Sequence, residues 1–202
     1  MDKLRIGILG LGRGITHLKN FLSLPEAEVI GACDRFPLLR ERAQEHIAAA
    51  GASTPVLNEF DELLALRPDA IMVATNGKLQ VEHACQALNA GCHVLSEVPG
   101  AYTQQECMRL RETVEYTGKT YMLAENTCYW DFFRYFRKWV AADRFGPISI
   151  AEGEYIHHLP ATLMRPDGSR LSPTAARAAG HRDATPIWRA DQPPIQYLTH
   201  DL

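Results

Sequence analysis

Short apolar runs alternate along the chain with longer segments in which apolar residues recur at helical spacing. Five runs predict β-strands, at residues 4–9, 28–33, 70–74, 93–96 and 120–124. The other segments predict helices at 15–22, 38–50, 60–66, 79–89, 103–116 and 130–142. This alternation is typical of right-handed crossovers between parallel strands. The chain is therefore predicted to be α/β, with a doubly wound parallel sheet (a Rossmann fold) whose ligand edge lies at the carboxyl ends of the strands.

The ends of the predicted helices carry the expected residues. Thr103 and Glu106 have the spacing of a capping box, and Gly91 and Gly118 stand where helices should end. The pattern changes near Gly146. Residues 148–157 alternate like a strand with one wetter face, and residues 159–187 show so little periodicity that they predict a long loop or lid, or a disordered insertion.

This change divides the chain into two predicted parts. Residues 1–125 form a dinucleotide-binding Rossmann domain, and residues 126–202 form the first part of an α+β substrate domain. Because too few strands follow Pro147 to make a sheet that stands alone, we expect the second domain to be incomplete and the chain to be C-terminally truncated.

A glycine turn follows the first predicted strand. Gly10, Gly12 and Gly14 let the backbone approach a diphosphate, the next helix offers free N–H groups, and Asp34 closes the second strand, where it can hold ribose hydroxyls. The third glycine of the usual motif would fall at Ile15, and Gly14 comes one residue early. The turn predicts a dinucleotide site, and the alternative is a tight turn without a ligand.

The residues around Asp34 bear on the choice of cofactor. The Asp34 carboxylate would repel a ribose 2′-phosphate, which favours NAD over NADP. Arg35 could accept the extra phosphate, so NADP stays open.

Composition narrows the classes of partner. The 202 residues carry a formal net charge of −3, which gives no basic field for nucleic acid, and the apolar runs are too short for a membrane span. We expect a cytoplasmic protein that binds small molecules. The five cysteines form no C-x-x-C pair and the eight histidines lack ligand spacing, which predicts reduced, mostly buried thiols and gives no support for a metal site.

Further motifs coincide in order along the chain. Thr75 and Asn76 end the third predicted strand, His83 lies on the following helix, and residues 90–99 read Ala-Gly-Cys-His-Val-Leu-Ser-Glu-Val-Pro. Over essentially its whole length the chain resembles the family of glucose-fructose oxidoreductase, inositol dehydrogenase and MocA-type proteins (Gfo/Idh/MocA). Members usually carry a lysine, often a catalytic one, where Val98 stands. Valine donates no proton, so lysine-assisted dehydrogenation lacks its usual group here.

Within that family, five segments resemble the branch that contains NAD-dependent α-N-acetylgalactosaminidases. These segments are residues 97–99, 122–126, 154–157, 188–189 and 197–200. The resemblance implies that NAD oxidises a sugar hydroxyl at C3, that the glycosidic group is eliminated, and that hydration and re-reduction close the cycle. Two catalytic carboxylates are then unnecessary. The same machinery stopped after hydride transfer would be a sugar dehydrogenase.

The resemblance also implies the residues that act on the sugar. His200 is our first choice for proton transfer, since its ordinary pKa lies near neutrality. Tyr197 and Tyr155 would anchor hydroxyls or share proton transfer, and Arg189 would contact the substrate beside Trp188. The alternatives are a packed histidine, half-buried strand tyrosines and a surface salt bridge.

The predicted cofactor contacts extend beyond the glycine turn and Asp34. At the ends of later strands, Glu97 is interpreted as a ribose or nicotinamide contact, and Glu125, which we count with the catalytic residues, would hold substrate or the nicotinamide ribose. Asn126 has a competing role as a helix N-cap. The other predicted cofactor contacts are Arg13, Ile15, Arg35, Thr75, Asn76 and His83.

Together these features predict an NAD(P)-dependent oxidoreductase that acts on a sugar or sugar derivative by hydride transfer. The alternatives are the redox-assisted glycosidase and, because of Val98, a non-catalytic dinucleotide sensor or interaction module. Family members often pair through the second domain, so a homo-oligomer is expected for a full-length protein.

Overall fold

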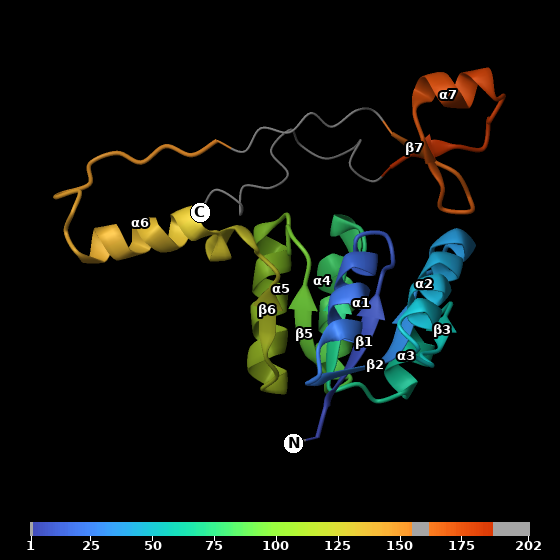
Figure 1. Ribbon diagram of the computed structural model, residues 1–202, viewed down its shortest axis with the longest axis horizontal. Helices are drawn as coiled ribbons and strands as arrows, with labels where there is room; N and C mark the ends of the chain where they lie inside the picture. The colour runs from blue at the N-terminus through green and yellow to red at the C-terminus, as the bar shows by residue number, and fades with distance from the viewer. Residues whose placement is uncertain (1, 155–161, 188–202) are drawn as a thin grey trace.

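A parallel sheet of six strands organises residues 4–123 of the computed structural model, which describes residues 2–154 and 162–187 (Figure 1). The strands are β1 (Leu4–Leu9), β2 (Ala27–Cys33), β3 (Val56–Leu57), β4 (Ala70–Val73), β5 (His93–Ser96) and β6 (Tyr121–Leu123). Their order is β3-β2-β1-β4-β5-β6, and every neighbouring pair is parallel. The predicted doubly wound sheet is confirmed.

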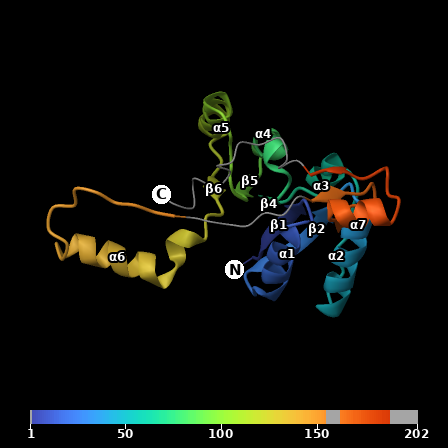
Figure 2. The same cartoon turned by 90° about the horizontal axis from the view of Figure 1, so that it is seen from above.

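Helices cover both faces of this sheet (Figure 2). One face carries α1 (Gly14–Ser23) and α2 (Pro37–Ala49), and the other carries α3 (Phe60–Ala65), α4 (Gln80–Asn89) and α5 (Gln104–Thr117). Two short 3₁₀ turns, η1 (Gly77–Leu79) and η2 (Thr127–Tyr129), follow β4 and β6. Burial on both faces explains why the central strands read as continuous apolar runs.

Local capping sets the helix ends as the sequence predicts. The Thr103 hydroxyl accepts the Glu106 N–H at 3.1 Å, and a Glu106 carboxylate oxygen accepts the Thr103 N–H at 3.0 Å. Gly118 ends α5 in the left-handed conformation, with φ of 64°. Two N-terminal donors and one C-terminal carbonyl of α5 are thereby satisfied within the chain.

The region after the sheet differs from its prediction. Helix α6 (Asp131–Ala141) extends away from the sheet, and α7 (Pro173–Ala178) accompanies a three-stranded antiparallel sheet. The strands of this second sheet are β7 (Leu163–Met164), β8 (Arg170–Leu171) and β9 (Thr185–Pro186). The interpretation of residues 159–187 as a segment without regular elements was therefore wrong at β7, β8, α7 and β9, while the described residues between them form turns and loops. Strands of two residues are too short to produce a readable alternation.

The predicted strand at 148–157 was wrong over its described part. Residues 148–154 form no strand, and Ile148 and Ile150 are exposed. Alternation predicts which face of a strand would be buried, but a strand also needs a hydrogen-bonded neighbour, and no described residue pairs with this segment. Residues 155–157 lie outside the described part.

The cysteines behave largely as predicted, because Cys33, Cys85 and Cys92 are buried free thiols. Among the described residues, no helix is long and apolar enough to cross a membrane. In the same part of the chain, no three His, Cys, Asp or Glu side chains are grouped so that they could hold a metal ion.

Candidate cofactor site

The glycine turn, residues 10–14, is shaped by close backbone approach. Gly10 has φ of +88°, and a Cβ there would lie 2.7 Å from the Ala74 carbonyl. A Cβ on Gly14 would lie 3.2 Å from the Cβ of Ala74. Gly14 therefore provides the close helix-to-strand contact that the usual motif assigns to the next position. Ile15 instead packs its side chain against the core, so only its backbone can face a ligand.

The amino end of α1 opens directly after this turn. No side chain of the described residues caps the helix, and Gly12 is exposed. The first N–H groups of a helix have no partner within it, and they carry the positive end of the helix dipole. This arrangement suits a phosphate group at the turn.

Asp34 lies where β2 ends and is only 8% exposed. One carboxylate oxygen accepts the Leu11 N–H at 2.7 Å, and the other accepts the Phe36 N–H at 2.9 Å. Arg40 donates to the Asp34 carbonyl at 2.8 Å. Each carboxylate oxygen can accept a further hydrogen bond, so Asp34 is locked to the glycine turn and still able to hold ribose hydroxyls. Burial, followed by the Asp34 charge, raises the pKa of the Cys33 thiol to about 12.

Thr75 and Asn76 follow β4, which lies beside β1 at the point where the strand order reverses. This is the place where doubly wound sheets bind their ligands. The Oδ1 atom of Asn76 is buried without a hydrogen-bond partner among the described residues. A buried acceptor is costly without a donor, so this atom fits contact with a bound group.

The side chain of His83 contacts Thr75, the residue after Ala74 at the end of β4. Its Nδ1 is hydrogen-bonded to the Thr75 hydroxyl at 3.0 Å, and its ring packs edge-on against Phe60. Burial lowers the pKa of His83 despite the nearby Glu82 charge. The side chain positions the end of β4.

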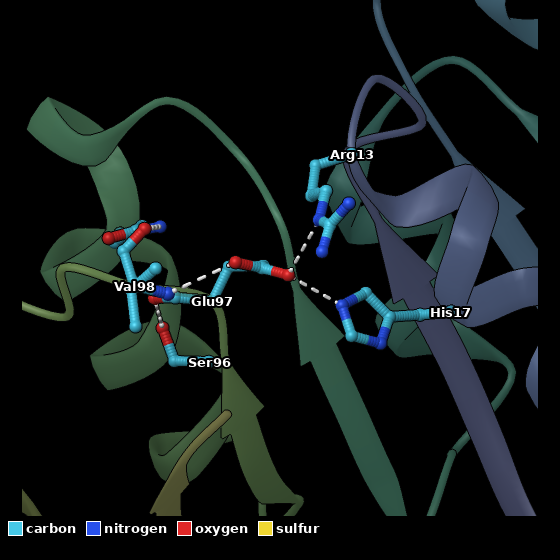
Figure 3. A network of polar contacts seen from close by, with 6 residues as sticks. Arg13, His17, Ser96, Glu97 and Val98 are labelled. Atoms are coloured by element: carbon cyan, nitrogen blue, oxygen red, sulfur yellow. Dashed lines mark hydrogen bonds and ion pairs between the residues drawn. The ribbon is translucent and has the colours of Figure 1, made fainter. Parts of the chain in front are cut away.

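Glu97, at the end of β5, joins two sides of the site (Figure 3). Its Oε1 is hydrogen-bonded to His17 Nε2 at 2.6 Å and to Arg13 Nε at 3.3 Å, and its Oε2 accepts the Val98 N–H at 3.2 Å. Burial by itself raises the pKa of Glu97, but His17 and Arg13 outweigh it and leave the pKa below its usual value. His17 was not predicted as a site residue, because its position one helical turn after Arg13 does not by itself point to Glu97, which lies 80 residues away.

The remaining described candidates lie at the two flanks of the same edge. The Arg35 guanidinium stacks over the Phe36 ring at 4.7 Å. A Glu125 carboxylate oxygen accepts the Thr127 N–H at 2.7 Å. Asn126 is exposed and occupies the N-cap position of η2, but its side chain makes no capping hydrogen bond there.

Four predicted residues, Tyr155, Arg189, Tyr197 and His200, lie outside the described residues. Their roles toward a substrate stay predictions. The described structure thus brings together the cofactor half of the predicted site.

A glycine turn, an uncapped helix and a locked carboxylate at the reversal of a parallel sheet define a dinucleotide-binding Rossmann domain. Residues 4–125 match the family model described as "oxidoreductase family, NAD-binding Rossmann fold" (Gfo/Idh/MocA), and the chain belongs to this family. The family resemblance drawn from the motifs is confirmed.

Curated relatives come from glycosyl hydrolase family 109. The chain is 31% identical over 166 residues to such a protein from Shewanella sp. (strain W3-18-1) and 34% identical over 167 residues to one from Phocaeicola vulgatus. Both matches cover 79% of this chain but only 36% and 35% of the relatives. The chain therefore spans about a third of the length of the curated relatives it matches.

Solved structures share the fold. The scyllo-inositol dehydrogenase from Lactobacillus casei, with bound NAD(H) and scyllo-inositol, has a TM-score of 0.65 at 21% identity, over 89% of this chain and 48% of that one. The WlbA dehydrogenase from Bordetella pertussis, in complex with NADH and UDP-GlcNAcA, has a TM-score of 0.65 at 26% identity, over 73% of this chain and 42% of that one.

Proposed function

We propose that the chain is the cofactor-binding part of an NAD-dependent oxidoreductase that acts on a sugar or sugar derivative. The observation that carries the proposal is the Asp34 carboxylate, fixed by the Leu11 N–H beside the open Gly12 at the reversal of the sheet. The membership of residues 4–125 in an NAD-binding family supports the same choice of cofactor.

The described residues divide between the two ends of such a cofactor. Backbone N–H groups around Gly12 would hold the diphosphate, and Asp34 would hold the adenosine ribose. Asn76 and Glu97, at the ends of β4 and β5, would face the nicotinamide end. When bound, the nicotinamide ring supplies a hydride acceptor.

The chemistry at the substrate falls to other side chains. Val98 has no proton to donate, so we assign proton transfer to His200, with Tyr197 and Tyr155 holding or sharing protons on sugar hydroxyls. We assign Arg189 to substrate recognition because its guanidinium can donate to two hydroxyls at once. The family 109 relatives and the sugar-like ligands named for the solved structures support a carbohydrate substrate.

Calorimetric titration of the chain with NAD⁺ and NADP⁺ tests the cofactor. We expect NAD⁺ to bind at least about tenfold more tightly, because a 2′-phosphate would lie against the Asp34 charge. In Asp34→Asn, which keeps an acceptor for the Leu11 N–H, we expect the preference for NAD⁺ to shrink. The exposed Glu41→Gln exchange in α2 serves as a charge control. No heat from NAD⁺ at millimolar concentration would overturn the proposal.

A redox-assisted glycosidase is the second candidate, favoured by the identities of 31% and 34% to family 109 proteins. The two functions differ in their products. Incubation with NAD⁺ and either free sugars or aryl glycosides separates them, because net NADH indicates a dehydrogenase and aglycone release without net NADH indicates the glycosidase. NAD⁺ binding with neither product would support the non-catalytic sensor instead.

A further inference from the structure

The hairpin formed by β7 and β8 (residues 163–171, the β7–β8 hairpin) lies against the adenosine end of the candidate site. Gly168 has φ of +93°, and a Cβ there would lie 2.7 Å from the Cβ of Phe36. The Leu38 N–H, in the first turn of α2, donates to the Asp167 carbonyl at 3.3 Å. Figure 1 shows β7 and α7 above α2, beyond the edge toward which the β1 and β5 arrows point.

The tip of this hairpin is held by its own contacts. The Gly168 N–H donates to the Arg165 carbonyl at 2.9 Å, and the Arg165 N–H donates to the Ser169 carbonyl at 2.9 Å. The Asp167 carboxylate accepts the Ser169 N–H at 2.8 Å and pairs with the Arg165 guanidinium at 3.3 Å. Because these bonds fix the turn, they also fix the direction of the residue that follows it.

That residue is Arg170, whose guanidinium reaches the glycine turn. Its Nη2 lies 3.8 Å from the position that a Cβ would take on Gly12, and apart from Gly12 and its two chain neighbours no other described residue comes within 4 Å of that position. Arg13, the other cation at the turn, is engaged by Glu97. The Arg170 guanidinium makes no hydrogen bond or ion pair with any described residue, so its five N–H donors stand beside an exposed backbone.

We infer that Arg170 binds the diphosphate of the dinucleotide, and that the β7–β8 hairpin is a strap that carries this arginine over the glycine turn. The inference rests on the proposed function. A guanidinium matches the paired oxygens of a phosphate, and it adds positive charge where the amino end of α1 offers only partial charge. The close fit of Gly168 on Phe36 places the strap, and Arg170 supplies the contact.

Titration of NAD⁺, ADP-ribose, inorganic phosphate and adenosine into wild type and Arg170→Ala tests the contact. We expect Arg170→Ala to lower the affinity for NAD⁺ and ADP-ribose by about ten- to hundredfold, the range of a charge-assisted hydrogen bond. The affinity for adenosine, which has no phosphate, should stay unchanged. Arg170→Lys should recover part of the loss. Arg177→Ala, which removes an exposed arginine from α7, should bind like wild type. Thermal unfolding verifies that the exposed substitutions leave the fold intact.

Gly168→Ala tests the strap separately from the charge. Its methyl group would meet Phe36 and displace the β7–β8 hairpin, so we expect a loss of NAD⁺ affinity close to that of Arg170→Ala. The double variant should lose little more than either single variant, because both changes remove one contact.

Three outcomes separate this inference from the proposed function. If wild type binds NAD⁺ and Arg170→Ala binds it equally well, the role of Arg170 is overturned and the proposed function stands. If Arg170→Ala lowers the affinity for inorganic phosphate but not for NAD⁺, the arginine binds another anion and the inference is likewise overturned. If wild type binds no NAD⁺, both the proposed function and this inference fail.

Discussion

Helices α1 and α6 show the same kind of apolar stripe in two different surroundings. Leu18 of α1 is 0% exposed beneath the sheet, whereas Phe136 of α6 is 46% exposed. The aromatic rings of α6 contact one another, as Phe136 and Trp139 do at 6.1 Å, but no sheet covers them among the described residues. A stripe at helical spacing therefore specifies the helix, while its contribution to stability depends on a second layer.

The largest expected effect comes from truncating one apolar side chain in each of these two helices. Leu18→Ala should lower the free energy of unfolding by about 2–5 kcal/mol, because it removes buried methyl groups and leaves a cavity. Phe136→Ala should cost about 1 kcal/mol or less, since the ring already faces solvent. Urea unfolding of both variants measures the difference. Equal losses would show that α6 is covered as well as α1 is.

Gly10→Ala, at the end of β1, separates the cost of a steric clash from the cost of a positive backbone φ alone. The new methyl group would lie 2.7 Å from the Ala74 backbone, on a residue with positive φ. We therefore expect the free energy of unfolding to fall by about 2–4 kcal/mol, and the affinity for NAD⁺ to fall as well. Gly118→Ala is the matched control, because Gly118 has φ of +64° and, apart from its chain neighbours, no described residue lies within 4 Å of the position that its Cβ would take. The control should lose only about 1 kcal/mol, from backbone strain. Similar losses in both would contradict the close approach at Ala74.

Glu97 links α1 to the end of β5, and its substitution should change the free energy of unfolding by an intermediate amount. Glu97→Gln should cost about 1–2 kcal/mol at pH 7, because it removes a partly buried charge from His17 and Arg13. The exposed pair of Arg111 and Glu115 is the control, and Glu115→Gln should cost less than about 0.5 kcal/mol.

The pH dependence of this link has a definite sign. The folded pKa of Glu97 lies below its ordinary value of 4.5, so its stabilisation is complete above about pH 4.5 and is lost as the pH falls through the lowered pKa. Urea unfolding between pH 3 and pH 6 should therefore show a shallower acid decline in Glu97→Gln than in wild type. An unchanged acid decline would argue against the network.

The smallest expected effect concerns His83. Burial lowers its folded pKa below the ordinary 6.5, so the unfolded chain takes up the proton first and stability declines as the pH falls below about 6.5. His83→Gln, which keeps a polar partner for Thr75, should flatten the pH dependence of Tm between pH 5 and pH 7. His46→Gln in the last turn of α2 is the control, and an equal flattening there would remove the special role of His83.

The elements that were predicted well are those with long, self-contained patterns. The strands at 4–9 and 93–96 were predicted to the residue, because each is an apolar run that both faces of the sheet bury. Strand β3 was missed, since Val56–Leu57 is too short to show a period and forms only by pairing with Ala32 and Cys33. The strand predicted at 148–157 failed over 148–154 for the opposite reason, a pattern without a partner.

The residues of the candidate site also fall into two groups, those that the sequence predicts and those that only the folded structure places there. The glycine turn and Asp34 could be found from the sequence because each stands directly after its own strand, and the same spacing pointed to the family. His17 and Arg170 could not be assigned to the site in this way, since each acquires its neighbours only after folding. A residue next to a strand end inherits its position from the strand, whereas a residue on a helix or hairpin depends on how that element packs.

The sequence by itself determined five of the six strands of the parallel sheet and the helices between them, the glycine turn, the carboxylate after β2 and the family. Only the tertiary structure decided that Asp34 accepts the Leu11 N–H 23 residues away, that Glu97 meets His17 80 residues away, and that Arg170 lies beside Gly12. Local patterns reflect the conformational preferences of neighbouring residues, and long-range contacts depend on how the crossovers stack the strands and helices into layers.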